Sequence, residues 1–87
     1  MLFHVTERYR GGDPGPVYRR FRESGRLTPE GVDYVASWVT DDLSTCFQVM
    51  DAESRDALDL WIERWSDLVE FEVVSVITSD EASVRVP

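Results

Sequence analysis

The stretch that most constrains this fold is residues 32–50, VDYVASWVTDDLSTCFQVM. Two runs rich in valine, threonine and aromatic residues flank a polar break at residues 40–44. β-Branched and aromatic side chains suit a pleated, half-buried surface, whereas aspartate and serine suit a turn. The stretch therefore predicts a β-hairpin, and the rest of the chain is interpreted as its cover or extension.

Two elements are expected before the hairpin. Phe3 and Val5 alternate with polar neighbours, which predicts a strand over residues 2–8. A helix should follow, because Asp13 is a good N-cap and proline is favoured in the first turn. Gly25 is a natural end for this helix.

Two more elements are expected after the hairpin. A helix from about Ser54 to Trp65 is predicted by apolar residues at i, i+3, i+4, i+7 and i+10, namely Leu58, Trp61, Ile62, Trp65 and Leu68. A nearly continuous run of β-formers predicts a last strand over residues 71–78. Residues 79–87 fit either a short helix or an extended tail.

The resulting order, β-α-β-β-α-β, is typical of a ferredoxin-like α+β sandwich. Its antiparallel sheet has the strand order 4-1-3-2, and both helices cover one face. With 87 residues and no linker or repeat, the chain is expected to be one domain, residues 1–87.

Two helices can cover only one face of this sheet, yet apolar residues occur on both. We expect Tyr34, Ala36 and Trp38 on one face of the second strand, and Val35 and Val39 on the other. Antiparallel sheets with a wet face normally alternate apolar with polar residues. A second copy packed on the open face would remove that apolar area from water, so a homodimer is expected.

Composition excludes several kinds of chemistry. All nine basic residues are arginine, so lysine bases and Schiff bases are absent. One His and one Cys cannot build a zinc site of cysteines and histidines or an internal disulfide. No acidic spacing resembles a calcium loop. We therefore expect no metal and no cofactor.

The net charge of −8 argues against nucleic acid as a partner, because such binding depends on neutralising phosphates. No apolar run approaches the roughly 20 residues that span a membrane, and the N-terminus does not resemble a signal peptide. A cytoplasmic protein without membrane contact is the expectation. A basic edge near the first helix consists of Arg19, Arg20, Arg22 and Arg26, which fits an anion, an acidic partner or solvated ion pairs.

Several phrases resemble a known family: the opening LFHVTERYRGGD, the stretches PVYRRFRESGR and CFQVMD, and above all WIERWSDLVEFEVVSV. They are similar to a family of small bacterial proteins of unknown function, which in turn resembles the dimeric α/β-barrel proteins. The resemblance covers about residues 2–78. It implies a ferredoxin-like protomer and a dimer, and it carries over no activity and no catalytic residue.

A tentative ligand site is expected on the sheet around His4, Trp38, Cys46 and Gln48. In the order 4-1-3-2 the first and third strands are neighbours, so His4 is expected beside Cys46 and Gln48. Trp38 would supply a flat apolar wall for an aromatic ligand. A polar patch on an apolar sheet suits a ligand pocket, but a satisfied cluster of hydrogen-bonded side chains at an interface fits the same residues.

Two functions are consistent with these features. The first is a dimeric module without chemistry of its own that binds a small molecule or a protein partner. The second is a cofactor-free enzyme, a monooxygenase or isomerase acting on a small aromatic or lactone-like substrate. Few residues suit acid–base work, so we expect the first. RNA binding fits less well, because STCFQVM lacks the glycine and basic residue of an RNA-binding strand.

Overall fold

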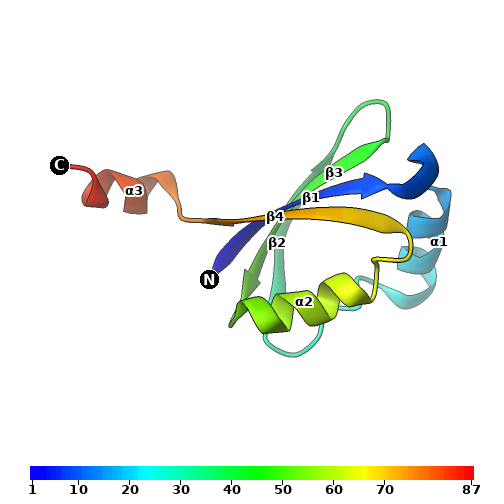
Figure 1. Cartoon of the computed structure of the whole chain (residues 1–87), viewed down its shortest axis with the longest axis horizontal. Helices are drawn as coiled ribbons and strands as arrows, with labels where there is room; N and C mark the ends of the chain where they lie inside the picture. Colours follow the sequence, from blue (N-terminus) through cyan, green and yellow to red (C-terminus); the bar gives the residue numbers. More distant parts are fainter.

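The computed structural model describes residues 1–87 and contains one four-stranded antiparallel sheet (Figure 1). The strands are β1 (Leu2–Tyr9), β2 (Val32–Val39), β3 (Thr45–Ala52) and β4 (Val69–Val76). The helices are α1 (Gly15–Ser24), α2 (Arg55–Glu63) and α3 (Ser79–Arg85), with a 3₁₀ turn at Arg10–Gly12.

The sheet order is β2-β3-β1-β4, which is the predicted order 4-1-3-2 counted from the other edge. The β-α-β-β-α-β order is also present, so the predicted ferredoxin-like fold is confirmed. The C-terminal segment, for which the sequence left two conformations open, forms the short helix α3. It projects beyond the end of the sheet, far from α1 and α2 (Figure 1). None of the three helices is long and apolar enough to cross a membrane.

The predicted hairpin joins β2 and β3 through a turn organised by Asp42. Its Oδ1 atom accepts hydrogen bonds from Thr40 Oγ1 at 2.7 Å, Ser44 Oγ at 2.7 Å and the Ser44 backbone N–H at 3.0 Å. These bonds, that of Thr40 first, lower the pKa of Asp42 to about 2. The polar break of the sequence is therefore a specific turn.

The helix starts match the sequence in one case and differ in another. Ser54 caps α2 as expected, because its side chain accepts a hydrogen bond from the Ala57 N–H at 3.1 Å. The cap of α1 is Pro14 rather than Asp13. The Asp13 carboxylate instead accepts from the Gly15 N–H at 2.9 Å, so it lies one residue further out than expected.

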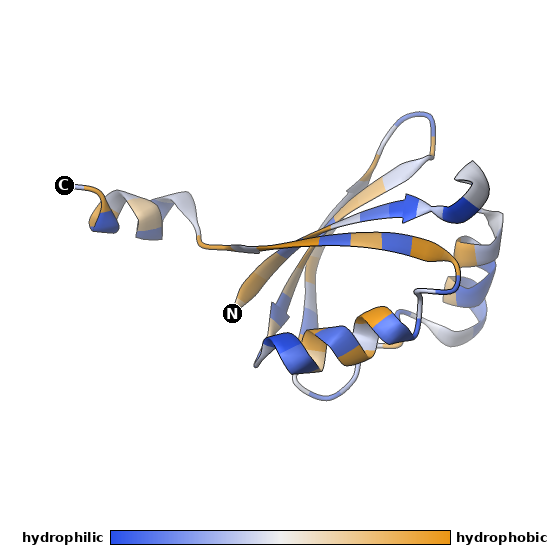
Figure 2. Ribbon diagram, in the orientation of Figure 1, coloured by the Kyte–Doolittle hydropathy of each residue, from blue (hydrophilic) through white to orange (hydrophobic).

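The main core lies between the sheet and α2. Its largest fully buried side chains include Trp61, Leu58, Val5 and Met50. Figure 2 shows the corresponding pattern on β4, where apolar and polar residues alternate along the strand. The apolar stripe predicted for α2 is thus the stripe that packs against the sheet.

A register shift in β2 changes which residues share a face. Tyr34 pairs with Met50 and Ala36 pairs with Val49, so Val35 lies between two pairs and has no partner of its own. This irregularity places Tyr34 on the helix side with Met50. The expectation that Tyr34 shares a face with Ala36 and Trp38 is therefore wrong, because strict alternation breaks at Val35.

The face of the sheet opposite the helices is open and partly apolar. Ala36, Val49, His4 and Val74 form one row across all four strands. Trp38 is 62% exposed, Val74 52% and Phe47 37%. The predicted apolar character of both faces is present, although Arg8 and Glu72 form an ion pair at 3.1 Å on the same face.

Candidate functional site

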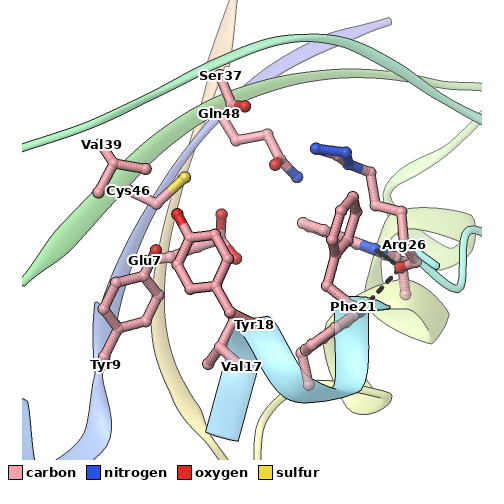
Figure 3. Close-up of a pocket in the computed structure, with 12 residues that line it drawn as sticks. Glu7, Tyr9, Val17, Tyr18, Phe21, Arg26, Ser37, Val39, Cys46 and Gln48 are labelled. Atoms are coloured by element: carbon pink, nitrogen blue, oxygen red, sulfur yellow. Dashed lines mark hydrogen bonds between the residues drawn. The ribbon is translucent and has the colours of Figure 1, made fainter. Parts of the chain in front are cut away.

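A cavity of about 100 Å³ lies between the sheet and α1. Figure 3 shows how side chains from β1, β3, α1 and the segment after α1 converge on it. Its lining is Glu7, Tyr9, Val17, Tyr18, Phe21, Arg26, Ser37, Val39, Cys46, Gln48, Trp61 and Trp65. Most of this surface is apolar, with a few polar groups pointing inward, as is typical of small-molecule sites.

Strand register brings the polar groups of the sheet together. In the β1–β3 pair, Glu7 is opposite Cys46 and Val5 is opposite Gln48, so these four residues share the helix side of the sheet. Glu7 is 7% exposed and Gln48 is 4% exposed, and they are the only hydrophilic side chains in the buried set. Both line the same cavity.

Burial gives Glu7 an unusual protonation equilibrium. Desolvation raises the pKa of its carboxyl from 4.5 to about 7, although a hydrogen bond with Cys46 and the charge of Arg26 both oppose the rise. Near neutral pH the side chain is therefore divided between its charged and neutral forms. It can accept a proton or donate one within the cavity.

Two neighbours of Glu7 on the sheet, Tyr9 and Cys46, stay neutral. Burial, followed by the charge of Glu7, raises the pKa of the Cys46 thiol to about 12, so this cysteine is not an activated nucleophile. Burial also raises the pKa of Tyr9, and a hydrogen bond with Tyr18 adds to that rise. Tyr9 and Tyr18 pack edge to face with ring centroids 6.4 Å apart.

Arg26 brings the positive charge to this site. Its guanidinium carbon lies 3.6 Å from the centroid of the Tyr34 ring and 5.1 Å from that of Phe21. Its Nε atom is buried and has no hydrogen-bond partner. In Figure 3 the guanidinium lies near the Gln48 amide, across the cavity from Tyr18 and Cys46.

Two tryptophans, Trp61 in α2 and Trp65 in the turn after it, fix the backbone at Arg26. The indole N–H groups of Trp61 and Trp65 both donate to the Arg26 carbonyl, at 3.0 and 2.9 Å. Arg64 also donates to the Leu27 carbonyl at 2.8 Å. The segment that carries the guanidinium is therefore held against the end of α2.

Only part of the site expected from the sequence lies at the cavity. Cys46 and Gln48 line it, whereas His4 pairs with Val49 and Trp38 pairs with Phe47 on the open face. The His4 ring instead stacks on Phe47, with centroids 6.0 Å apart. The expectation that His4 lies beside Cys46 and Gln48 is wrong. Even-numbered residues of β1 pair with odd-numbered residues of β3, so His4 lies on the opposite face of the sheet from Cys46 and Gln48.

The sequence reasoning missed Glu7, Tyr18 and Arg26 as site residues. A signal for Glu7 was available, because Phe3, Val5 and Glu7 share one phase of the alternating strand. A charged residue in the apolar phase indicates a buried carboxylate. Arg26 had no such signal in the sequence. Nothing in the pattern of the four arginines showed that Arg26 lines a cavity whereas Arg20 forms an ion pair with Asp67 on the surface.

The raised pKa of Glu7 predicts a specific dependence of stability on pH. Between pH 4.5 and about 7 the folded chain holds a proton on Glu7 that the unfolded chain has lost. Stability therefore falls as pH rises through this window. One pKa unit corresponds to about 1.4 kcal/mol. Glu7→Gln should therefore reduce the fall in unfolding free energy across this pH window by ~2–3 kcal/mol.

Chemical denaturation of the wild type and Glu7→Gln at about pH 5 and about pH 8 measures this effect. Glu63→Gln is the control, because it makes the same change at an exposed position of α2. The assigned pKa direction would be wrong if Glu7→Gln and the wild type lost stability in parallel.

Two solved structures share this fold. The chain matches the protein Atu4242 from Agrobacterium tumefaciens with a TM-score of 0.53 and 11% identity, over 91% of this chain and 96% of that one. It matches Rv0793 from Mycobacterium tuberculosis with a TM-score of 0.52 and 13% identity, over 91% and 98%. At this identity the likeness shows the fold alone.

No curated protein matches the sequence. A family model does match, and it spans residues 1–86, which is nearly the whole chain. The expected resemblance to a family of unknown function is thus confirmed. The chain belongs to the DUF3303 family, a domain of unknown function.

Proposed function

We propose that this protein is a homodimeric binding module that holds a small organic molecule in the cavity between the sheet and α1. The observation that carries the proposal is the placement of Glu7 and Gln48, the two buried hydrophilic side chains, on one cavity. Buried polar groups normally have good hydrogen-bond partners. The Gln48 amide donates only to the Met50 sulfur at 3.2 Å, and thioether sulfur is a weak acceptor.

The size of the cavity limits the ligand. Its volume of about 100 Å³ is below the roughly 300–1,000 Å³ of drug-sized pockets. A cavity of about 150 Å³ is known to hold benzene. The cavity therefore encloses less than one whole six-membered ring, and the rest of the ligand would extend through its open side. The apolar lining favours a ring or a branched carbon chain.

Filling the cavity should abolish ligand binding. Ser37 lines it from the edge strand β2 and is only partly buried, so Ser37→Met adds volume to the cavity and also removes the hydrogen bond between Ser37 and Tyr34. Fragment-sized compounds that bind the wild type in ligand-detected NMR should lose their signals with Ser37→Met. Two controls should keep them: Ser37→Ala, which removes the hydrogen bond with Tyr34 without adding volume, and Ser66→Met, the same change at an exposed position.

This experiment has two contradicting outcomes. If Ser37→Met binds the same fragments as the wild type, the ligands occupy another surface. If no fragment binds the wild type, the cavity is a packing defect and not a binding site.

The open face of the sheet supports the homodimer. Its row of Ala36, Val49, His4 and Val74 crosses every strand, and Trp38 and Phe47 extend the apolar area beside it. A symmetric dimer brings the same patch of each copy together, so one partly apolar face is sufficient. Apolar area of this kind contributes roughly 25 cal/mol per Å² when it leaves water.

A charge in the middle of this face should separate the copies. Phe47→Asp would bury an unpaired carboxylate in the proposed interface, which costs several kcal/mol and should weaken self-association by about a hundredfold or more. Leu60→Asp is the control, because it places the same charge at an exposed apolar position on α2. Sedimentation equilibrium measures both; a wild type that is monomeric at micromolar concentration would refute the dimer.

Glu7 also favours a second candidate function, a cofactor-free enzyme. A general base is most effective when its pKa lies near the working pH, and that of Glu7 is about 7. In a lactone-like substrate, Glu7 would take a proton from the carbon next to the carbonyl, and the electron pair would move onto the carbonyl oxygen. Return of the proton to another carbon would complete an isomerisation.

This candidate predicts exchange of carbon-bound hydrogen in D₂O. With a β,γ-unsaturated γ-lactone, the wild type should speed up the exchange seen by NMR, and Glu7→Gln should lose about a hundredfold or more of that rate. Glu63→Gln should retain it. A rate equal to that in buffer alone would leave the binding module as the function.

A further inference from the structure

We propose that the ligand of this cavity is a small apolar monocarboxylate, whose carboxylate group binds Arg26 and whose carbon body packs against the aromatic lining. The inference rests on the proposed function and adds a ligand class to it. Three features carry it: the unused donors of Arg26, the hydrophilic groups beside it, and the charge balance of the cavity.

Arg26 has donors without acceptors. It takes part in none of the six ion pairs of the structure. Its Nε atom is buried and lacks a hydrogen bond. Its two terminal nitrogens also donate to no protein atom, but they are accessible from the cavity, so an acceptor supplied by a ligand can reach them.

The aromatic rings around Arg26 determine which of its groups a ligand can reach. With its central carbon 3.6 Å from the Tyr34 ring centroid, the guanidinium is covered on one face. Its donors lie in the plane of the group, at the edge, where they fit the two oxygens of a carboxylate. Tyr34 is itself held by a hydrogen bond between its hydroxyl and Ser37, at 2.8 Å.

The rest of the lining suits the other parts of the ligand. The Gln48 amide lies between the guanidinium and Glu7 in Figure 3 and has donors for the second carboxylate oxygen. The body of the ligand would contact Val17, Val39 and the aromatic rings of the lining. Such a surface favours a phenyl ring or a branched alkyl chain over a sugar or a polyol.

The charges at the cavity admit one anion. The groups that face Glu7 are Tyr9 from its own strand, Cys46 from β3, Tyr18 from α1, and Arg26. Arg26 is the only cation among the lining residues and Glu7 the only acid. Burial raises the pKa of Tyr9 and of Cys46, so these two groups are neutral near pH 7.

A bound carboxylate therefore lies close to Glu7. Glu7 and Arg26 line the same space of about 100 Å³, and like charges held this close together disfavour each other. Glu7 should take up a proton when the ligand binds, and its neutral form can donate a hydrogen bond to the ligand. A ligand with two carboxylates should bind more weakly, because its second negative charge would also lie near Glu7.

Benzoate and benzamide test the inference, because they share their shape and differ in charge. Titration calorimetry of the intact protein should show benzoate binding at least about tenfold more tightly than benzamide near neutral pH, as expected for hydrogen bonds to a charged group. Benzoate affinity should fall by about tenfold between about pH 6 and about pH 8, because binding takes up one proton.

Two variants locate these effects. Arg26→Met should lower benzoate affinity by about tenfold or more and change that for benzamide little, whereas Arg22→Met, at an exposed position of α1, should change neither. Glu7→Gln should remove the pH dependence while retaining benzoate binding. The amide chemical shifts of each variant show whether it is folded.

The outcomes separate this inference from the proposed function. Equal binding of benzoate and benzamide, or an Arg26→Met protein that retains benzoate, would overturn the carboxylate inference and leave the cavity a site for neutral ligands. Benzoate affinity without pH dependence would overturn the role of Glu7. The cavity itself is tested separately, by loss of binding with Ser37→Met and retention of binding with Ser37→Ala.

Discussion

The double hydrogen bond to the Arg26 carbonyl supports much of this structure. Trp61 belongs to the apolar stripe of α2 and Trp65 lies in the turn that follows this helix, and both rings lie in the main core. Their indole N–H groups need an acceptor once buried, and both find it in one carbonyl just beyond the C-terminal cap of α1. The same contact therefore closes the core and holds the segment that places a guanidinium at the cavity.

The inner face of the sheet has two halves with different packing. Beneath α2, large apolar residues such as Phe3 and Met50 meet Leu58 and Trp61 in close contact. Beneath α1, the corresponding strand positions carry Glu7, Cys46 and Gln48, which are small or polar. A carboxylate and an amide cannot be packed as a hydrocarbon surface can. The open volume under α1 follows from these three residues.

The sequence was sufficient for the elements and their order, because periodicity and caps are local signals. It was not sufficient for the site, which depends on register and faces. Strict alternation was assumed along β2, but one unpaired residue at Val35 altered the face of Tyr34. His4 was grouped with Cys46 and Gln48 by strand adjacency, and adjacency does not determine which face a side chain occupies. Glu7 could have been found from its phase in the strand, whereas the position of Arg26 depends on long-range contacts.

The irregularity at Val35 also bears on how copies of this chain avoid the wrong contacts. β2 is an edge strand, and an unblocked edge is a template for indefinite strand addition and aggregation. A displaced residue in the middle of β2 interrupts the row of backbone groups that another strand would need. The opposite edge, β4, carries the charged side chains Glu70 and Glu72, which pair with Arg10 and Arg8, and charged side chains on an edge strand hinder strand addition. With both edges protected against fibril-like growth, the proposed dimer through the open face of the sheet would be a closed and finite assembly.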